Sequence, residues 1–323
     1  MKTSSLLVLA ALTLAGAASA VSVTRQNIVI AGSVDDDESG HAGPDSARVV
    51  AYFNALGSAD PMLCAMVTDQ LGNFWSSEGD DGIGSLADAS RRWEPARDSL
   101  ASRITDPAAK RVAFRALAVD DACVRRSAAK MLGRSGSHAA AEIRQGLRAA
   151  NPRVREATLL ALGESELPEF LTDAEQATRD DNPAVVAMAT WALGEYKQPS
   201  SFGRLEQLVG SRELRVRRAA AWALGELDDP RAAPLLTPLL RDPDILTRIV
   251  ATEALAEIAD ATTVEALGAV LGDPNLRLRR AVVRALAEIE DLATVPYLLK
   301  AIKDSDPEIR RIAAEALGDR KDN

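Results

Sequence analysis

The apolar and polar positions of this chain follow one pattern that recurs through most of its length. Each copy ends in a leucine and a small residue, with an apolar residue or threonine nine positions before the small residue. We number every copy from this small residue, which we call the anchor. Successive anchors are 30 residues apart once and 31 residues apart thereafter, and they are Gly133, Gly163, Gly194, Gly225, Ala256, Ala287 and Gly318. A fixed period of this length predicts a stacked repeat array.

Each period predicts two helices. The second helix begins after a residue whose side chain can accept hydrogen bonds from the free N–H groups of the first turn, and these caps are Asp121, Asn151, Asn182, Glu213, Asp244, Asn275 and Asp306. Apolar residues then recur at helical spacing, as in Ile309, Ala313 and Ala316, and predict one buried stripe. The glycine anchors suit a left-handed helix end. A shorter helix, opened or bent by proline, precedes each long one.

A helix pair of this size cannot bury its apolar face alone, so consecutive pairs must stack on one another. The predicted fold is therefore all-α, an α-solenoid of two-helix repeats with a period of about 31 residues. The composition agrees, because apolar residues make 47% of the chain while aromatic residues make only 4%. A β-sheet protein would use more β-branched and aromatic residues.

The stretch ATVPYLLKAIKDSDPEIRRIAAEALG combines a proline in its first helix with the sequences D-P-x-I-R and A-x-A-L-G. This combination resembles the short HEAT repeat, of the class first associated with phycobilisome lyases. The resemblance implies a regular array of seven HEAT-like copies over residues 106–323. It also implies divergent HEAT-like helices over 47–105, with a copy at 59–75 and a Gly-rich insertion, SSEGDDGIGS, after it.

The first twenty residues have the features of a secretory signal peptide. Lys2 precedes an apolar run at 6–14 and the small residues Ala-Ser-Ala at 18–20. We expect cleavage before Val21 and a secreted or periplasmic protein, with an uncleaved anchor segment as the alternative. The apolar run is too short for a comfortable membrane span, so none is expected after cleavage. Residues 21–46, rich in acidic residues, glycine and serine, are expected to form a disordered linker.

Export would expose both cysteines, Cys64 and Cys123, to an oxidising compartment. They belong to copies two periods apart, and packed helices lie about 8–10 Å from each other. The two sulfurs are then expected about 20 Å apart, which is too far for a disulfide. We therefore expect free thiols.

Few residues are candidates for catalysis or metal binding. The chain has two histidines, His41 and His138, which excludes the paired His–Glu metal sites of the deoxyhypusine hydroxylase branch of HEAT-like proteins. No Cys/His cluster has metal-ligand spacing, and no Gly-rich phosphate loop or G-x-S-x-G motif is present. We expect no enzyme activity, no metal and no cofactor. The net charge of −9 argues against nucleic acid as a partner.

An arginine recurs eight positions before the anchor, one helical turn from the cap. In every copy with this arginine, the cap residue, such as Asp244 or Asp306, is expected to accept its hydrogen bonds. In one copy Val186 stands in place of the arginine. The arginines are Arg125, Arg155, Arg217, Arg248, Arg279 and Arg310. The resemblance to HEAT arrays implies a structural Arg–Asp/Asn ladder between neighbouring repeats. The alternative is a basic ladder that binds acidic partners.

Helical spacing places three further positions side by side, those seven before, three before and one after the anchor. We call their surface the second-helix face, and the resemblance implies that it lines the concave side of the array. Trp191 and Trp222 lie three before the anchor, where other copies hold mostly long polar residues, so we expect both to be partly exposed. The alternative is that both cover the seam between repeats. The candidate binding residues are Trp191, Trp222, Arg218, Arg126, Lys130, Arg280, Arg284, Glu195, Glu226 and Glu257.

These features predict a monomeric, non-catalytic scaffold that holds an unidentified protein or peptide in its groove, because Trp and Arg most often dominate interface energies. One alternative is an enzyme subunit of the lyase class that the repeats resemble. Those lyases work on a cytoplasmic antenna, which an export signal contradicts. A second alternative is a nucleic-acid binder like the HEAT-type alkylpurine glycosylases, against which the negative charge and the export signal argue.

Overall fold

The computed structural model of the protein describes residues 21–23, 28–30, 45–57, 103–259 and 261–320. The predicted signal peptide, the helical copy at 59–75 with Cys64, and the Gly-rich insertion lie outside the described residues. The described part falls into two compact units, unit 1 at residues 1–167 and unit 2 at residues 168–323.

Unit 1 contains two short strands and five α-helices among its described residues. The helices are α2 (Ser46–Gly57), α6 (Pro107–Ala116), α7 (Ala122–Arg134), α8 (Ala140–Leu147) and α9 (Pro152–Ser165), and the 3-10 turn η1 (Gly136–Ala139) precedes α8. Helix α2 packs on α6 and α7, α7 packs on α9, and α8 packs on α9. The long helices α7 and α9 are the predicted second helices of their copies.

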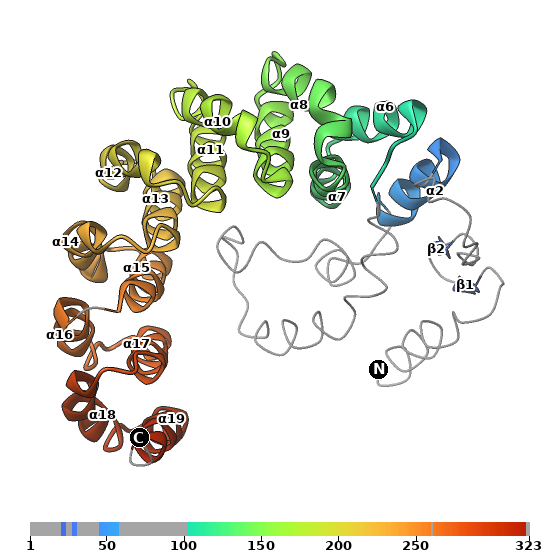
Figure 1. The fold of residues 1–323 in the computed structure, drawn as a ribbon. Helices are drawn as coiled ribbons and strands as arrows, with labels where there is room; N and C mark the ends of the chain where they lie inside the picture. The colour runs from blue at the N-terminus through green and yellow to red at the C-terminus, as the bar shows by residue number, and fades with distance from the viewer. Residues whose placement is uncertain (1–20, 24–27, 31–44, 58–102, 260, 321–323) are drawn as a thin grey trace. The chain divides into compact units, whose positions relative to one another are not determined.

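Unit 2 consists of helices that alternate between short and long. The short helices and 3-10 turns are η2 (Pro168–Phe170), α10 (Leu171–Ala177), η3 (Pro199–Ser201), α12 (Phe202–Val209), η4 (Pro230–Ala232), α14 (Ala233–Leu236), η5 (Thr237–Arg241), α16 (Ala261–Ala269), η6 (Leu292–Thr294) and α18 (Val295–Ala301). The long second helices are α11 (Pro183–Glu195), α13 (Leu214–Glu226), α15 (Ile245–Ile258), α17 (Leu276–Glu288) and α19 (Pro307–Asp319). Each second helix packs on the next one, and the short helices form a separate layer beside them (Figure 1). This is the stacked α-solenoid that the repeat pattern predicts.

A small antiparallel pair of strands differs from the prediction of a wholly disordered linker. Strand β1 (Val21–Val23) pairs with β2 (Ile28–Ile30), with Val21 opposite Ile30. Both strands alternate or repeat β-branched residues, which suit a strand. The rest of the linker up to residue 44 lies outside the described residues.

The caps form as the sequence predicts in six of the seven second helices. Asp121 accepts a hydrogen bond from the N–H of Val124, and Asp306 accepts one from the N–H of Ile309. Asn151, Asn182, Asp244 and Asn275 act in the same way. Glu213 makes no such bond, because the first-turn N–H groups favour the short side chains of Asp, Asn, Ser and Thr.

Cys123 is buried and disulfide-bonded, so the expectation of a free thiol is wrong. That expectation assumed two regular periods of stacked helices between the cysteines. Residues 58–102, on which the assumption depends, lie outside the described residues.

The glycine anchors have a different role from the predicted one, because they lie inside the last turn of their helices and do not end them. A Cβ atom added to Gly194 would lie 2.5 Å from Cζ3 of Trp222 and 2.9 Å from Cα of Ala223 on the next second helix. At Gly225, an added Cβ would lie 2.7 Å from the Cβ of Ala254. The anchor is therefore small because consecutive second helices touch there.

The residues with a left-handed backbone conformation lie three positions after the anchor. They have φ between 48° and 55°, and they are Gly136, Glu166, Lys197, Asp228 and Ala259. The sharp turn therefore lies in the connection between copies, three residues after the anchor. It does not lie at the anchor itself, where the sequence analysis predicted it.

The close approach at the anchor predicts opposite effects of one substitution at two equivalent positions. Gly194→Ala should lower the free energy of unfolding by about 1–3 kcal/mol, because the added methyl forces α11 and α13 apart. Gly318→Ala is the matched control, since no atom lies within 4 Å of an added Cβ there. Alanine favours a helix over glycine by up to about 1 kcal/mol, so the control should be neutral or more stable. Urea unfolding followed by circular dichroism measures both, and equal effects would contradict the role of the anchor.

Candidate functional site

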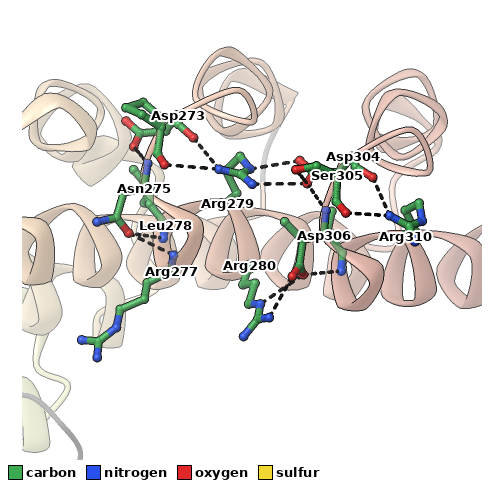
Figure 2. Close-up of polar contacts among 12 residues, drawn as sticks. Asp273, Asn275, Arg277, Leu278, Arg279, Arg280, Asp304, Ser305, Asp306 and Arg310 are labelled. Atoms are coloured by element: carbon green, nitrogen blue, oxygen red, sulfur yellow. Dashed lines mark hydrogen bonds and ion pairs between the residues drawn. The ribbon is translucent and has the colours of Figure 1, made fainter. Parts of the chain in front are cut away.

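The recurring arginines hold the start of their own helix, as Arg125, Arg155 and Arg310 do through backbone carbonyls. Arg217, Arg248 and Arg279 also reach the loop before the second helix of the next repeat. Arg279 donates from Nη1 to the backbone oxygen of Asp273, just before its own helix, at 3.0 Å. It also donates from Nε and Nη2 to the two carboxylate oxygens of Asp304, in the following repeat, at 3.0 and 3.3 Å (Figure 2). Both side chains of this pair are mostly buried. The pair is bidentate, the geometry that gives an Arg–carboxylate contact its strength and direction.

The acceptor of this ladder is not the predicted one. Arg217 bonds Asp242 at 2.7 and 3.3 Å, and Arg248 lies 4.0 Å from Asp273. Each of these aspartates stands two residues before the cap, where it also accepts the N–H of the cap residue, as Asp242 does from Asp244 at 2.8 Å. The sequence contains the signal that identifies them, because Asp242, Asp273 and Asp304 recur every 31 residues.

The caps Asp244 and Asp306 bind a different arginine, the one seven before the anchor. Arg218 donates to Asp244 at 3.0 Å, and Arg280 donates to both oxygens of Asp306 at 3.1 and 2.9 Å (Figure 2). The hydrogen bonds from Arg280 lower the pKa of Asp306 below its usual range. Arg218 is only 4% exposed, so its assignment to a binding surface is wrong, and its charge stabilises the contact between repeats.

The two tryptophans form one stack across the seam between α11 and α13. Their ring centroids are 6.2 Å apart and the rings are inclined by 20°. Trp191 is 5% exposed and Trp222 is half-buried. The expectation that Trp191 is partly exposed is wrong, because Trp222 from the next repeat lies on it. The equivalent Lys130 in unit 1 is also buried, and its Nζ lies 3.5 Å from Glu164 of the next repeat.

The other candidate residues of the second-helix face are more open to solvent. Arg126 on α7 and Arg284 on α17 are exposed, and Arg280 is half-buried. The acidic position one after the anchor becomes more exposed along unit 2. Glu195 and Glu226 are half-buried, whereas Glu257, Glu288 and Asp319 are exposed. Within unit 2, therefore, the exposed part of the second-helix face begins at Trp222 and extends over α15, α17 and α19.

Acidic side chains dominate this exposed part. Glu226 is paired with Lys197, whose Nζ lies 2.7 Å from its carboxylate, and this hydrogen bond is the first cause of the raised pKa of Lys197. Glu253, Glu257 and Glu288, which we call the central acidic cluster, have no basic side chain within ion-pair distance among the described residues. Sequence reasoning missed Glu253 and Glu288, although both lie at register positions of the face.

Glu253 shows the electrostatic strain in this cluster. Neighbouring protein atoms reduce the hydration of its carboxyl even though the side chain is exposed, and the charges of Glu288 and Glu257 repel it. Arg284 opposes these effects only in part, and the pKa of Glu253 is raised to about 7.

The described residues contain no group of three or more His, Cys, Asp or Glu side chains suited to hold a metal ion. Over the same residues, every helix is too short or too polar to cross a membrane.

Comparisons with known proteins place the repeats in a family. A model of HEAT repeats matches residues 113–186, 171–256 and 234–318, which together span more than half of the chain. No curated protein matches the chain in sequence.

Several solved structures are similar to the chain. The complex of CpcE and CpcF of phycocyanin lyase from Nostoc sp. shares 21% identity at a TM-score of 0.44, over 66% of this chain and 88% of that one. Human deoxyhypusine hydroxylase shares 21% identity at a TM-score of 0.35, over 83% and 99%. YibA of Escherichia coli shares 18% identity at a TM-score of 0.48, over 77% and 100%. At these identities the similarity concerns the fold alone and transfers no activity.

The stack of tryptophans predicts that equivalent positions respond differently to truncation. Trp191→Ala should cost about 3–5 kcal/mol of stability, as for other buried large side chains. Trp222→Ala should cost less, because part of that side chain already faces solvent. Arg284→Ala, at the same register position but exposed, is the control and should change stability by no more than about 0.5 kcal/mol. Thermal and urea unfolding measure all three, and an unchanged Trp191→Ala protein would show that the stack does not support the seam.

Proposed function

The chain belongs to the HEAT-repeat family, and on this premise we propose that it is an exported, non-catalytic scaffold that binds a protein or peptide segment on its second-helix face. The family supplies a rigid stack of helix pairs, an architecture that presents one extended surface across several repeats. The non-catalytic part of the proposal rests on the sequence, which has two histidines and no catalytic motif.

The observation that carries the proposal is the exposed run of register-equivalent side chains from Trp222 to α19. The arginines that bond Asp242, Asp244, Asp304 and Asp306 are used within the fold. In contrast, Arg284, Glu257 and Glu288 are exposed on α15 and α17, and among the described residues none of them forms an ion pair with a neighbouring repeat. Side chains that are exposed on a rigid element and have no structural task are suited to contact a partner.

Export is supported by two independent features. Residues 1–20 have the charged, apolar and small-residue regions of a signal peptide. Cys123 is disulfide-bonded, and disulfides persist mainly in oxidising compartments outside the cytosol.

Cleavage of the signal should give a mature protein that begins at Val21. N-terminal sequencing of the exported protein measures this directly. An exported or membrane-associated form that still begins at Met1 would contradict cleavage, and a product found only in the cytosol would contradict export.

Binding on the second-helix face should be detectable with a random peptide library displayed on phage and selected on the mature protein. Selected peptides should bind at least about 10-fold more weakly, a loss of about 1.4 kcal/mol, to the variant Glu257→Lys/Arg284→Glu. This variant changes two exposed residues of the face and leaves the net charge unchanged. The matched control is Glu206→Lys/Arg241→Glu, which makes the same exchange at exposed residues of α12 and η5.

The control should bind the selected peptides as the wild type does. If no peptide is selected, or if the face variant and the control bind equally, the second-helix face is not the binding surface.

A further inference from the structure

On the second-helix face of unit 2, some charged side chains form ion pairs within the fold and others do not. The fold pairs Arg218 and Arg280 with carboxylates of the next repeat. Arg311 is paired within α19, with Glu308 and Glu315. The central acidic cluster lies between these paired regions, on α15 and α17. In the described part of the chain it forms no ion pair, although Arg284 attracts Glu253. Three carboxylates therefore remain together on a face where most other charges are neutralised.

This arrangement destabilises the isolated protein. Glu253 and Glu257 are four residues apart on α15, and like charges at this spacing cost about 0.2–0.5 kcal/mol. Glu288 on α17 adds its repulsion to that of Glu257 at Glu253, and both add to the loss of hydration that is the largest cause of the raised pKa of Glu253. Places where a sequence departs from local consistency are expected at functional sites. A cation supplied from outside the chain would remove this repulsion.

An aromatic surface adjoins the acidic cluster. Trp222 occupies the same register position as Glu253, one helix earlier in the stack, and α13 packs directly on α15. Its ring is held by the stack with Trp191 and is half-exposed. A lysine or arginine side chain is attracted both to an indole face and to carboxylates.

The distance between successive second helices sets the spacing of the positive charges that a bound segment would need. The acidic position after the anchor is filled on four consecutive second helices, by Glu195, Glu226, Glu257 and Glu288. Packed helices lie about 8–10 Å apart, and an extended chain advances about 3.3 Å per residue. An extended segment that crosses the second helices would thus pass one acidic position about every third residue.

We propose that the second-helix face from Trp222 to Glu288 docks an extended partner segment that carries a lysine or arginine at about every third residue. This inference rests on the proposed function and specifies the chemistry of the partner. The cationic side chains of the segment contact the central acidic cluster, and one of them lies against the ring of Trp222. Charge complementarity selects this occupant over an acidic or purely apolar segment.

The test uses two fluorescent peptides with the same composition, KSSKSSKSSK and KKKKSSSSSS, and the mature protein. Fluorescence anisotropy at low ionic strength measures the dissociation constants, because exposed charges are screened least there. The spaced peptide should bind the wild type more tightly than the clustered one. The variant Glu253→Gln/Glu257→Gln/Glu288→Gln should bind the spaced peptide at least about 10-fold more weakly, or about 1.4 kcal/mol.

The matched control is Glu206→Gln/Glu265→Gln/Glu290→Gln. These exposed residues lie on α12, on α16 and after α17, and their replacement changes the net charge by the same amount. The control should bind within about twofold of the wild type. The cluster variant should also melt at no lower temperature than the wild type, because the repulsion that it loses at Glu253 exceeds the attraction of Arg284, and this measurement shows that it is folded.

Equal weakening in the cluster variant and the control would overturn the proposal, because attraction to the overall negative charge of the protein would then explain the binding. Absence of binding by the wild type would also overturn it. Equal affinity for the two peptides would contradict the proposed spacing of one lysine or arginine at about every third residue. Library peptides that bind the face but carry no lysine or arginine would contradict this inference while the scaffold function stands.

Discussion

Every feature of this protein depends on the contact between one second helix and the next. A helix pair of about 31 residues exposes an apolar stripe that it cannot cover by itself, so the neighbouring repeat must cover it. The anchor permits this contact, since Gly194 brings the backbone of α11 close to Ala223, and Gly225 brings α13 close to Ala254. The closely packed seam contains mainly leucine and alanine, including the fully buried Leu193, Leu224 and Leu255.

The arginine ladder fixes the edge of the same contact. Arg217, Arg248 and Arg279 each reach an aspartate 25 residues later, at Asp242, Asp273 and Asp304. Within unit 2 the one copy that lacks the arginine also lacks the acceptor, because Val186 is followed 25 residues later by Ser211.

Two kinds of side chain therefore share the second helices. Arg218 and Trp191 serve the seam, because the next repeat supplies a carboxylate for one and an indole ring for the other. In the part of the chain that the structure describes, Glu253, Glu257 and Glu288 form no ion pair with the next repeat. The proposed binding function is placed on this second group for a physical reason: a partner can gain free energy only from groups that the fold has not already satisfied.

The sequence by itself determined the features that lie within one copy. The period, the two helices and six of the seven caps follow from helical spacing and from hydrogen bonds between residues two or three apart. The tertiary structure decided what depends on the distance between copies. It placed Trp222 over Trp191, moved the acceptor of Arg279 from the cap to Asp304, and gave the anchor a packing role in place of a turn. Sequence spacing places residues on a helix face, but whether such a residue meets solvent or a neighbour depends on how closely the next helix approaches.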